Sequence, residues 1–336
     1  MLCPFWGRNR RPDQSWPDYA DRLIETGREF LELTEIEQAD IGVFPQAWKQ
    51  LQEDAGGIAR VRAFDEAARA SGKPRVYFLE GNVVVPVPLE GAIVMHTSLL
   101  RSRRLPTEFA LPHFHDDLLN YSHGELQVRR KRPRALVSFC GAVLRKQPPQ
   151  TPRQRLRRVA GGGRRSALRL LGRPDPDDLY VRANALDALL GQDEVETDVI
   201  VRDEPGGGAW TTPFDASLWE KVRRDYVRSI VESDYVLCAR GANNTSWRFY
   251  ETLSLGRIPV FVDTDCVLPY DFLLPWRDYC VWIDRSDLEN IGERVATFHE
   301  GLSEDEFVEL QRECRRLWEE YLSPHGFFSN FYRHLS

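Results

Sequence analysis

The chain has 336 residues, of which 42% are hydrophobic and 11% aromatic, enough to form the cores of two ordinary domains; a disordered chain is excluded. Its formal net charge of −6 at pH 7 argues against nucleic acid as the main partner. No apolar run approaches the roughly 18 residues of a membrane helix, and the first 16 residues lack the apolar core of a signal peptide. We therefore expect a cytoplasmic protein without an integral membrane segment. Peripheral association with a membrane and the oligomeric state stay open.

The six cysteines are widely separated and none forms a CxxC pair. Several of them lie inside apolar runs that are typical of strands. Buried, reduced thiols are therefore favoured over disulfides or metal ligands.

The first half of the chain predicts one α/β unit. Residues 1–16 are polar and basic, and we expect a flexible N-terminus there. Over residues 17–130 strand-like runs alternate with a helical segment that Ser71-Gly72 ends. The expected strands are Ala39–Phe44, Val76–Leu79 and Ala92–Met95, and the expected helix is Gly57–Ala70. The charged connector Glu125–Arg134 leads to the next domain.

The second half, residues 131–300, alternates strands and helices more regularly. Short β-branched runs separated by helical segments are typical of a doubly wound parallel sheet. The expected strands are Ala135–Cys140, Asp198–Val201, Tyr235–Cys238, Ile258–Val262 and Cys280–Ile283; the expected helices are Leu179–Leu190, Ser217–Ser233, Ser246–Leu255 and Leu288–Glu300. In residues 301–336, Ser303-x-x-Glu306 predicts a capping box that begins a last helix. We expect this segment to pack back across a cleft between the domains.

Residues 151–176 have an unusual composition, with eight arginines between Arg153 and Arg173 and the glycine run Gly161–Gly163. One interpretation is a solvated helix with a flexible arm. Another is an electropositive rim that faces an anionic substrate. Nucleic-acid binding is disfavoured because no aromatic residues are interleaved with the arginines.

Two loops at strand ends carry residues suited to bind phosphate. Gly141 ends the first strand of the second domain, where a glycine lets the backbone approach an anion closely, and Arg145 follows it. After Tyr235–Cys238, Arg240 and Gly241 lead to Thr245 and Ser246, either of which is a good helix N-cap. An exposed helix face remains an equally good interpretation of Arg145.

Arg248 and Glu251 are three residues apart and share one face of the predicted helix. They form either a surface ion pair of little energetic value or a ligand site. In the second case Arg248 contacts a phosphate and Glu251 accepts hydrogen bonds from a ribose. Their place just after the loop favours the ligand site.

The stretch from Arg240 to Trp276 resembles the signature of exostosin-type glycosyltransferases (glycosyltransferase family 47). That family shows an RG-rich loop, a serine, then R-F-x-E-x-x-x-x-G-x-I-P-V, an L-P-(F/Y) element and a tryptophan. The matching residues are Arg240, Gly241, Ser246, Arg248, Phe249, Glu251, Gly256, Ile258, Pro259, Val260, Leu268, Pro269, Tyr270 and Trp276. Weaker likeness at LVSFCGA, LPHFHDD and ADIGVFPQAW extends it over residues 39–284. The basic insert at 151–176 and Cys140 depart from the family pattern.

The resemblance implies two facing Rossmann-like domains, the GT-B architecture, with an active site in the cleft between them. It implies a nucleotide-sugar donor held by the C-terminal domain, a saccharide or glycan acceptor beside the N-terminal domain, and inversion at the anomeric carbon. No metal cofactor is expected, because side chains and helix N-termini neutralise the diphosphate in B-type enzymes. The tripeptide Asp263-Thr264-Asp265 is read as a turn. The expected donor-binding residues are Gly141, Arg145, Arg240, Gly241, Thr245, Ser246, Arg248 and Glu251.

The catalytic base is expected from the first domain, near the strand ends that precede the connector. Asp117 is the preferred base, with Asp116 and His115 as the next candidates; His113 and His96 are further ones. Two other interpretations remain open. In the first, the chain is a non-catalytic nucleotide-sugar-binding partner of another transferase. In the second, it is an anion- or nucleic-acid-binding protein that uses its arginine-rich arm.

Overall fold

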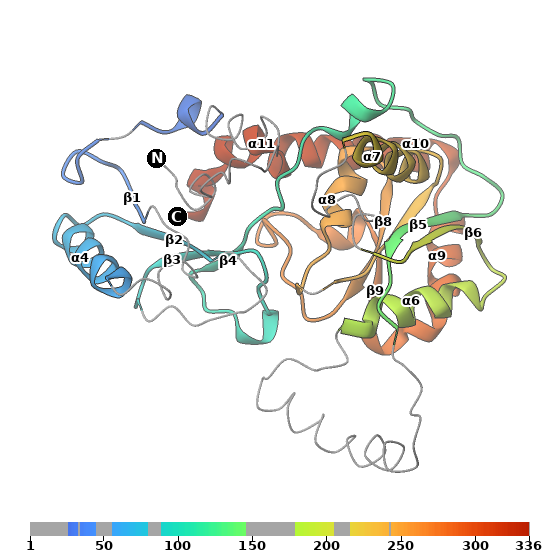
Figure 1. Cartoon of the computed structure of the whole chain (residues 1–336), viewed down its shortest axis with the longest axis horizontal. Helices are drawn as coiled ribbons and strands as arrows, with labels where there is room; N and C mark the ends of the chain where they lie inside the picture. The colour runs from blue at the N-terminus through green and yellow to red at the C-terminus, as the bar shows by residue number, and fades with distance from the viewer. Residues whose placement is uncertain are drawn as a thin grey trace, which may run out of the picture.

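The computed structural model describes residues 26–32, 34–44, 56–79, 89–145, 179–204, 216–241 and 243–335. The expectations for residues 1–16 and for the arginine-rich stretch 151–176 lie outside these residues. Two parallel sheets with helices around them make up the described chain, which confirms the α/β prediction (Figure 1).

The first sheet has four parallel strands in the order β1-β2-β3-β4. Their bounds are Gly42–Val43, Arg75–Leu79, Ile93–His96 and Glu108–Ala110. Helix α4 (Gly57–Ala70) has the predicted bounds and buries Val61 and Ala68. Strand β4 was not predicted, because three residues are too few to show a strand period. The short 3₁₀ helices η1 (Arg101–Arg103) and η2 (Leu118–Tyr121) follow this sheet's last two strands.

The second sheet has five parallel strands in the order β6-β5-β7-β8-β9. Their bounds are Glu196–Arg202, Leu136–Ala142, Tyr235–Cys238, Ile258–Asp263 and Val281–Asp284. The chain runs from β5 to one edge at β6, returns to the other side of β5 at β7, and continues outward. The order of strands therefore reverses between β5 and β7, and open α/β sheets bind ligands beyond the carboxyl ends of the strands at such a point.

Helices cover both faces of the second sheet. In Figure 1, α7, α8 and α10 lie on one side of it, and α6 and α9 on the other. The bounds are α6 Val181–Leu190, α7 Ala216–Val231, α8 Trp247–Ser254, α9 Ile291–Glu300 and α10 Glu304–Leu317, with the short helices η5 Trp276–Asp278 and η6 Arg285–Asn290. All five of the longer helices were predicted, and the Ser303–Glu306 capping box is present. Of the six cysteines, the five in the described residues are free and buried, as expected.

Carboxyl-end loops of the two sheets contact each other. Ser98, after β3, accepts a hydrogen bond from the Asn244 backbone N–H (2.8 Å). Arg101 pairs with Asp263 at 3.0 Å, and the Ser102 N–H donates to Asp265 Oδ1 at 3.0 Å. These contacts, which we call the interdomain latch, orient the ligand-binding edges of both sheets toward one another.

The C-terminal residues return to the first sheet. After α10 come η7 (Trp318–Leu322), α11 (Pro324–Ser329) and η8 (Phe331–His334). The ring of Phe331 stacks on Phe78 of β2, with centroids 6.5 Å apart, and His334 meets Phe109 of β4 at 5.1 Å. The last segment therefore spans both domains.

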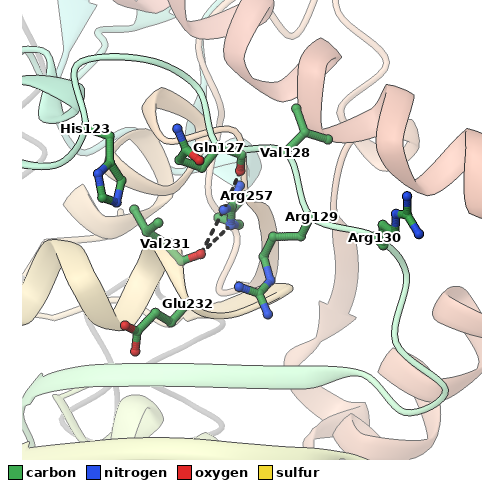
Figure 2. A pocket seen from close by; sticks show the side chains of 8 residues that line it. All are labelled: His123, Gln127, Val128, Arg129, Arg130, Val231, Glu232 and Arg257. Atoms are coloured by element: carbon green, nitrogen blue, oxygen red, sulfur yellow. Dashed lines mark hydrogen bonds between the residues drawn. The ribbon is translucent and has the colours of Figure 1, made fainter.

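Arg257, just before β8, fixes the connector between the domains. Its side chain is fully buried and donates to the carbonyls of Gln127 in the connector (2.7 Å) and Val231 at the end of α7 (2.8 Å), as Figure 2 shows. Burial, followed by the charge of Arg129, lowers the pKa of Arg257 to about 10. The surrounding pocket has a volume of about 450 Å³ and is lined by His123, Gln127, Val128, Arg129, Arg130, Val231, Glu232 and Arg257. It lies at the amino end of β8, away from the edge where such sheets bind ligands.

Replacing Arg257 by methionine tests this role. We expect Arg257→Met to lower the free energy of unfolding by about 3–5 kcal/mol, because several buried carbonyls lose their donor. Urea unfolding measures the change. The matched control is Arg312→Met on the exposed face of α10, which should alter stability by at most about 0.5 kcal/mol. Equal stabilities for the two variants would contradict the role of Arg257.

Candidate functional site

Arg248 crosses the point where the strand order reverses. It follows the first residue of α8, and its Nη2 donates to the carbonyl of Cys140 on β5 (2.7 Å). Its guanidinium lies over the ring of Phe139, 4.5 Å from the centroid. The Nε–H is buried without an acceptor. A guanidinium with an unused buried donor, at the carboxyl end of β5, is suited to bind an anion.

Arg182 reaches the same point from the opposite face of the sheet. It lies on α6, and its Nη1 donates to the carbonyl of Ala142 (3.1 Å) at the end of β5, while Nη2 approaches that of Ala239 (3.4 Å) after β7. Burial, followed by the charge of Arg248, lowers the pKa of Arg182 to about 10. Within the described residues neither guanidinium hydrogen-bonds a carboxylate. A buried and a half-buried cation at the same strand ends favour a multiply charged anion between them.

The two predicted glycines make room for these arginines. A Cβ on Gly141, whose φ is +156°, would lie 2.7 Å from Arg248 Nη2. A Cβ on Gly241 would lie 2.9 Å from Arg182 Nη2. Gly141 was expected to admit a phosphate to the backbone; in the structure it admits the guanidinium instead.

The loop before α8 supplies further polar groups. Ser246 is the N-cap residue, but its hydroxyl is buried and caps no backbone N–H, so it is free for a ligand. Thr245 is buried beside the phenol of Tyr250 without a well-aligned hydrogen bond. Arg240 donates to Asn244 Oδ1 (3.0 Å), which holds the loop against the interdomain latch. The N-terminus of α8 thus adds its own partial positive charge to that of the arginines.

Glu251 lies one turn into α8 and is the acidic residue of the site. Arg223 donates to Oε1 (3.1 Å), and the Tyr226 hydroxyl donates to Oε2. Burial alone raises the pKa of the Glu251 carboxyl, but Arg223 and the other neighbours outweigh it and hold the pKa below its usual value. Each oxygen therefore already accepts one hydrogen bond, and each keeps a lone pair for a further donor.

Arg145 is separate from this cluster. Its guanidinium pairs with Asp187 on α6 at 2.5 Å, and both side chains are half exposed. The structure therefore favours the surface interpretation of Arg145 over donor binding.

The segment after β4 runs along α8 from one end to the other. His113 packs on Trp247 at the N-terminus of α8, with ring centroids 4.9 Å apart. Asp117 lies near the other end, because Arg315 binds both Asp117 and the carbonyl of Ser254. Trp247 and Ser254 are about 10 Å apart along the helix axis. Only the His113 end of the segment therefore lies at the end of α8 that carries Arg248.

Asp117, the preferred base, is placed unfavourably for that role. Arg315 binds both of its oxygens, at 2.8 and 2.6 Å, and the Leu119 N–H donates to Oδ1. Burial raises the pKa of Asp117, but Arg315 outweighs burial and lowers the pKa below its usual value. Asp117 thus has a structural role that joins η2 to α10. It lies at the C-terminal end of α8, away from the residues expected to bind the donor diphosphate.

The two other base candidates, His115 and Asp116, each have a hydrogen-bond partner within the same part of the chain. His115 is buried against Trp318, and its Nδ1 lies 2.7 Å from the Asp116 carbonyl. Asp116 is a hydrogen-bond acceptor of the Tyr121 hydroxyl at 3.4 Å. His113 has a buried Nε2 without an aligned partner, and burial lowers its pKa to about 3, so it is neutral at pH 7. It is the best-placed proton acceptor of this segment.

Two features of the site were not predicted from the sequence. The sequence predicted Arg182 only as part of a helix; its signal, the one basic residue of the helix between β5 and β6, is clear only once the sheet order is known. The tripeptide Asp263-Thr264-Asp265 belongs to the interdomain latch, since both of its carboxylates bind residues 101–102. Among the described residues no group of histidine, cysteine and acidic side chains is arranged to hold a metal ion.

Buried His113 predicts a pH-dependent stability. The unfolded chain gains a proton on this histidine below pH about 6.5, whereas the folded chain does not until near pH 3. Stability is therefore lost as pH falls through 6.5. Between pH 6.5 and 5, His113→Gln should remove about 2 kcal/mol of the wild-type decline in unfolding free energy. Urea unfolding at both pH values measures it. The control His123→Gln changes an exposed residue and should show the same fall in unfolding free energy as the wild type. If His113→Gln also showed the wild-type fall, His113 would not be neutral in the folded chain.

Comparison with known proteins identifies the family. The model of the Exostosin GT47 domain matches residues 101–298, which is more than half of the chain. The chain is 29% identical to Exostosin-1 of Drosophila melanogaster over 99 residues, 30% of this chain and 12% of that protein. It is 28% identical over 100 residues to the "Probable beta-1,4-xylosyltransferase IRX10L" of Arabidopsis thaliana, covering 26% of this chain and 24% of that protein. The matches thus span less than a quarter of these relatives' length.

Among solved structures, a glycosyltransferase from Rickettsia africae ESF-5 aligns with 96% of this chain and 83% of its own, at a TM-score of 0.42 and 9% identity. That likeness is too distant to bear on the site. Within the described residues, none of the helices combines the length and apolarity needed to traverse a bilayer.

Proposed function

Because this chain belongs to the exostosin family, with its GT47 domain over residues 101–298, we propose that it is a glycosyltransferase that uses a nucleoside-diphosphate sugar. The observation that carries the proposal is the pair formed by Arg182 and Arg248 at the reversal point between β5 and β7. Their charges suit the diphosphate of such a donor. Ser246 and the N-terminus of α8 supply neutral donors beside them.

The acceptor is a saccharide or glycan bound on the side of the first domain. Its hydroxyl oxygen attacks the anomeric carbon of the donor sugar, and the bond from that carbon to the diphosphate oxygen breaks. A single displacement of this kind inverts the anomeric centre. The hydroxyl proton goes to a base on the acceptor side, and the nucleoside diphosphate leaves with the electron pair of the broken bond.

His113 is our candidate for the base. It comes from the first domain, lies beside the N-terminus of α8, and carries a buried Nε2 without an aligned partner. Its low pKa keeps it neutral before the donor binds. A bound diphosphate adds negative charge nearby, which raises the proton affinity of the imidazole when the reaction needs it.

The arginine pair stabilises the leaving group. Negative charge grows on the diphosphate as the bond to the sugar breaks, and fixed positive groups in a buried site lower the energy of that state. We propose that these side chains perform the task without a metal ion. Glu251 keeps the cluster oriented through Arg223 and Tyr226.

Donor turnover by the purified chain tests the proposal. We expect at least one member of a panel of nucleotide sugars to release its nucleoside diphosphate, at the same rate with and without EDTA. Arg248→Met should lower kcat by about 10²–10³-fold, because one transition-state donor is removed. His113→Gln should lower it by about 10²–10⁴-fold.

The control variant is Arg228→Met on the exposed face of α7, which should keep wild-type turnover. Donor binding without any turnover would favour the non-catalytic partner instead. Loss of turnover in EDTA would show that a metal ion contributes.

A further inference from the structure

Trp247 is an exposed aromatic residue at the start of a buried helix. The seven other residues of α8 are buried, whereas Trp247 is 48% exposed. The adjacent residues, Ser246 and Arg248, belong to the proposed donor site. The exposed indole therefore lies at the edge of that site.

The indole faces the first domain. One side of it packs against the His113 imidazole, with ring planes 33° apart. His113 comes from the segment after β4, so the two rings meet where the domains meet. A ligand that covers the rest of the indole would contact both domains at once.

The groups around the indole match the surface of a sugar ring. A pyranose has an apolar face of C–H groups and hydroxyls around its edge. The indole offers a flat apolar surface, and the residues next to it, Ser246 before it in the chain and His113 packed on its ring, each carry a buried polar atom without an aligned partner. Ligand sites commonly combine apolar walls with a few polar groups of this kind.

We propose that Trp247 is the platform on which the acceptor saccharide stacks, and that it selects acceptors whose terminal sugar presents an apolar face. This inference rests on the proposed function. It places the acceptor on the exposed face of the indole, whose other face His113 covers, so that the acceptor lies beside the imidazole at the junction of the two domains. Trp247 is then a specificity-determining residue that the exostosin-like motif leaves as a variable position.

The test compares the wild-type chain with Trp247→Ala and Trp247→Phe on an array of oligosaccharides, with inorganic pyrophosphate present. We expect the wild type to bind a subset of the array, Trp247→Ala to lose at least about tenfold in apparent affinity, and Trp247→Phe to recover part of it. The control is Tyr332→Ala, which removes another exposed aromatic side chain and should leave binding unchanged.

Calorimetry on the same variants separates the possible failures. Pyrophosphate should bind the wild type and Trp247→Ala with equal affinity. Each nucleoside diphosphate tested, that of uridine, adenosine, guanosine or cytidine, should likewise bind both chains equally well. If Trp247→Ala weakened a nucleoside diphosphate but not pyrophosphate, the indole would stack on the nucleobase, and the proposal would be overturned. The proposal would also be overturned if no oligosaccharide on the array bound the wild type, or if the wild type and all the variants bound equally well. Failure of the wild type to bind pyrophosphate would instead contradict the proposed function.

Discussion

Two positive charges, the buried Arg248 and the half-buried Arg182, meet where the strand order of the second sheet reverses, and the site is built around them. Each guanidinium is held by backbone carbonyls of β5 or of the residue after β7, and each needs a glycine opposite it. Mutual repulsion and burial make this arrangement unfavourable by itself, as the lowered pKa of Arg182 reflects. An anion of two or more charges relieves both costs. The acidic residue of α8, Glu251, compensates only part of the charge because it also pairs with Arg223.

The rest of the fold orients this edge of the second sheet toward the first domain. The interdomain latch joins the loops after β3 and β8, and the saturated guanidinium of Arg257 fixes the connector at the opposite edge. The segment from His113 to Asp117 follows α8 and is anchored at its far end by Arg315. His113 is thereby presented to the donor side while Asp117 is held in a structural ion pair. The same segment thus supplies a chemical group at one end and an anchor at the other.

Much of the fold was predictable because the local signals were strong. The bounds of α4 and of β7 agreed with the sequence, since Ser71-Gly72 and a short run of buried β-branched and aromatic residues mark them clearly. The capping box of α10 was equally clear. Strand β4 was missed because its three residues give no period, and β1 is shorter than expected because only two residues pair with β2.

The site was predictable only in part. Arg248 and Ser246 follow from a motif within one loop and helix. Arg182 lies about 60 residues upstream, and only the parallel pairing of β5 with both β6 and β7 brings it to Gly241. Asp117 was misplaced for a similar reason. The carboxylate is held by Arg315, which is almost 200 residues away in the chain. A prediction based on the position of Asp117 after β4 could not include that contact.

The most direct test of the arginine pair is calorimetric titration of pyrophosphate into the wild type, Arg182→Met, Arg248→Met and the double variant, each first shown to be folded. Either single substitution should weaken binding by about 10- to 100-fold, because each removes a charged donor. The two losses should not add, since the arginines bind the same anion. Wild-type affinity in both single variants would show that the arginine pair is not the anion site.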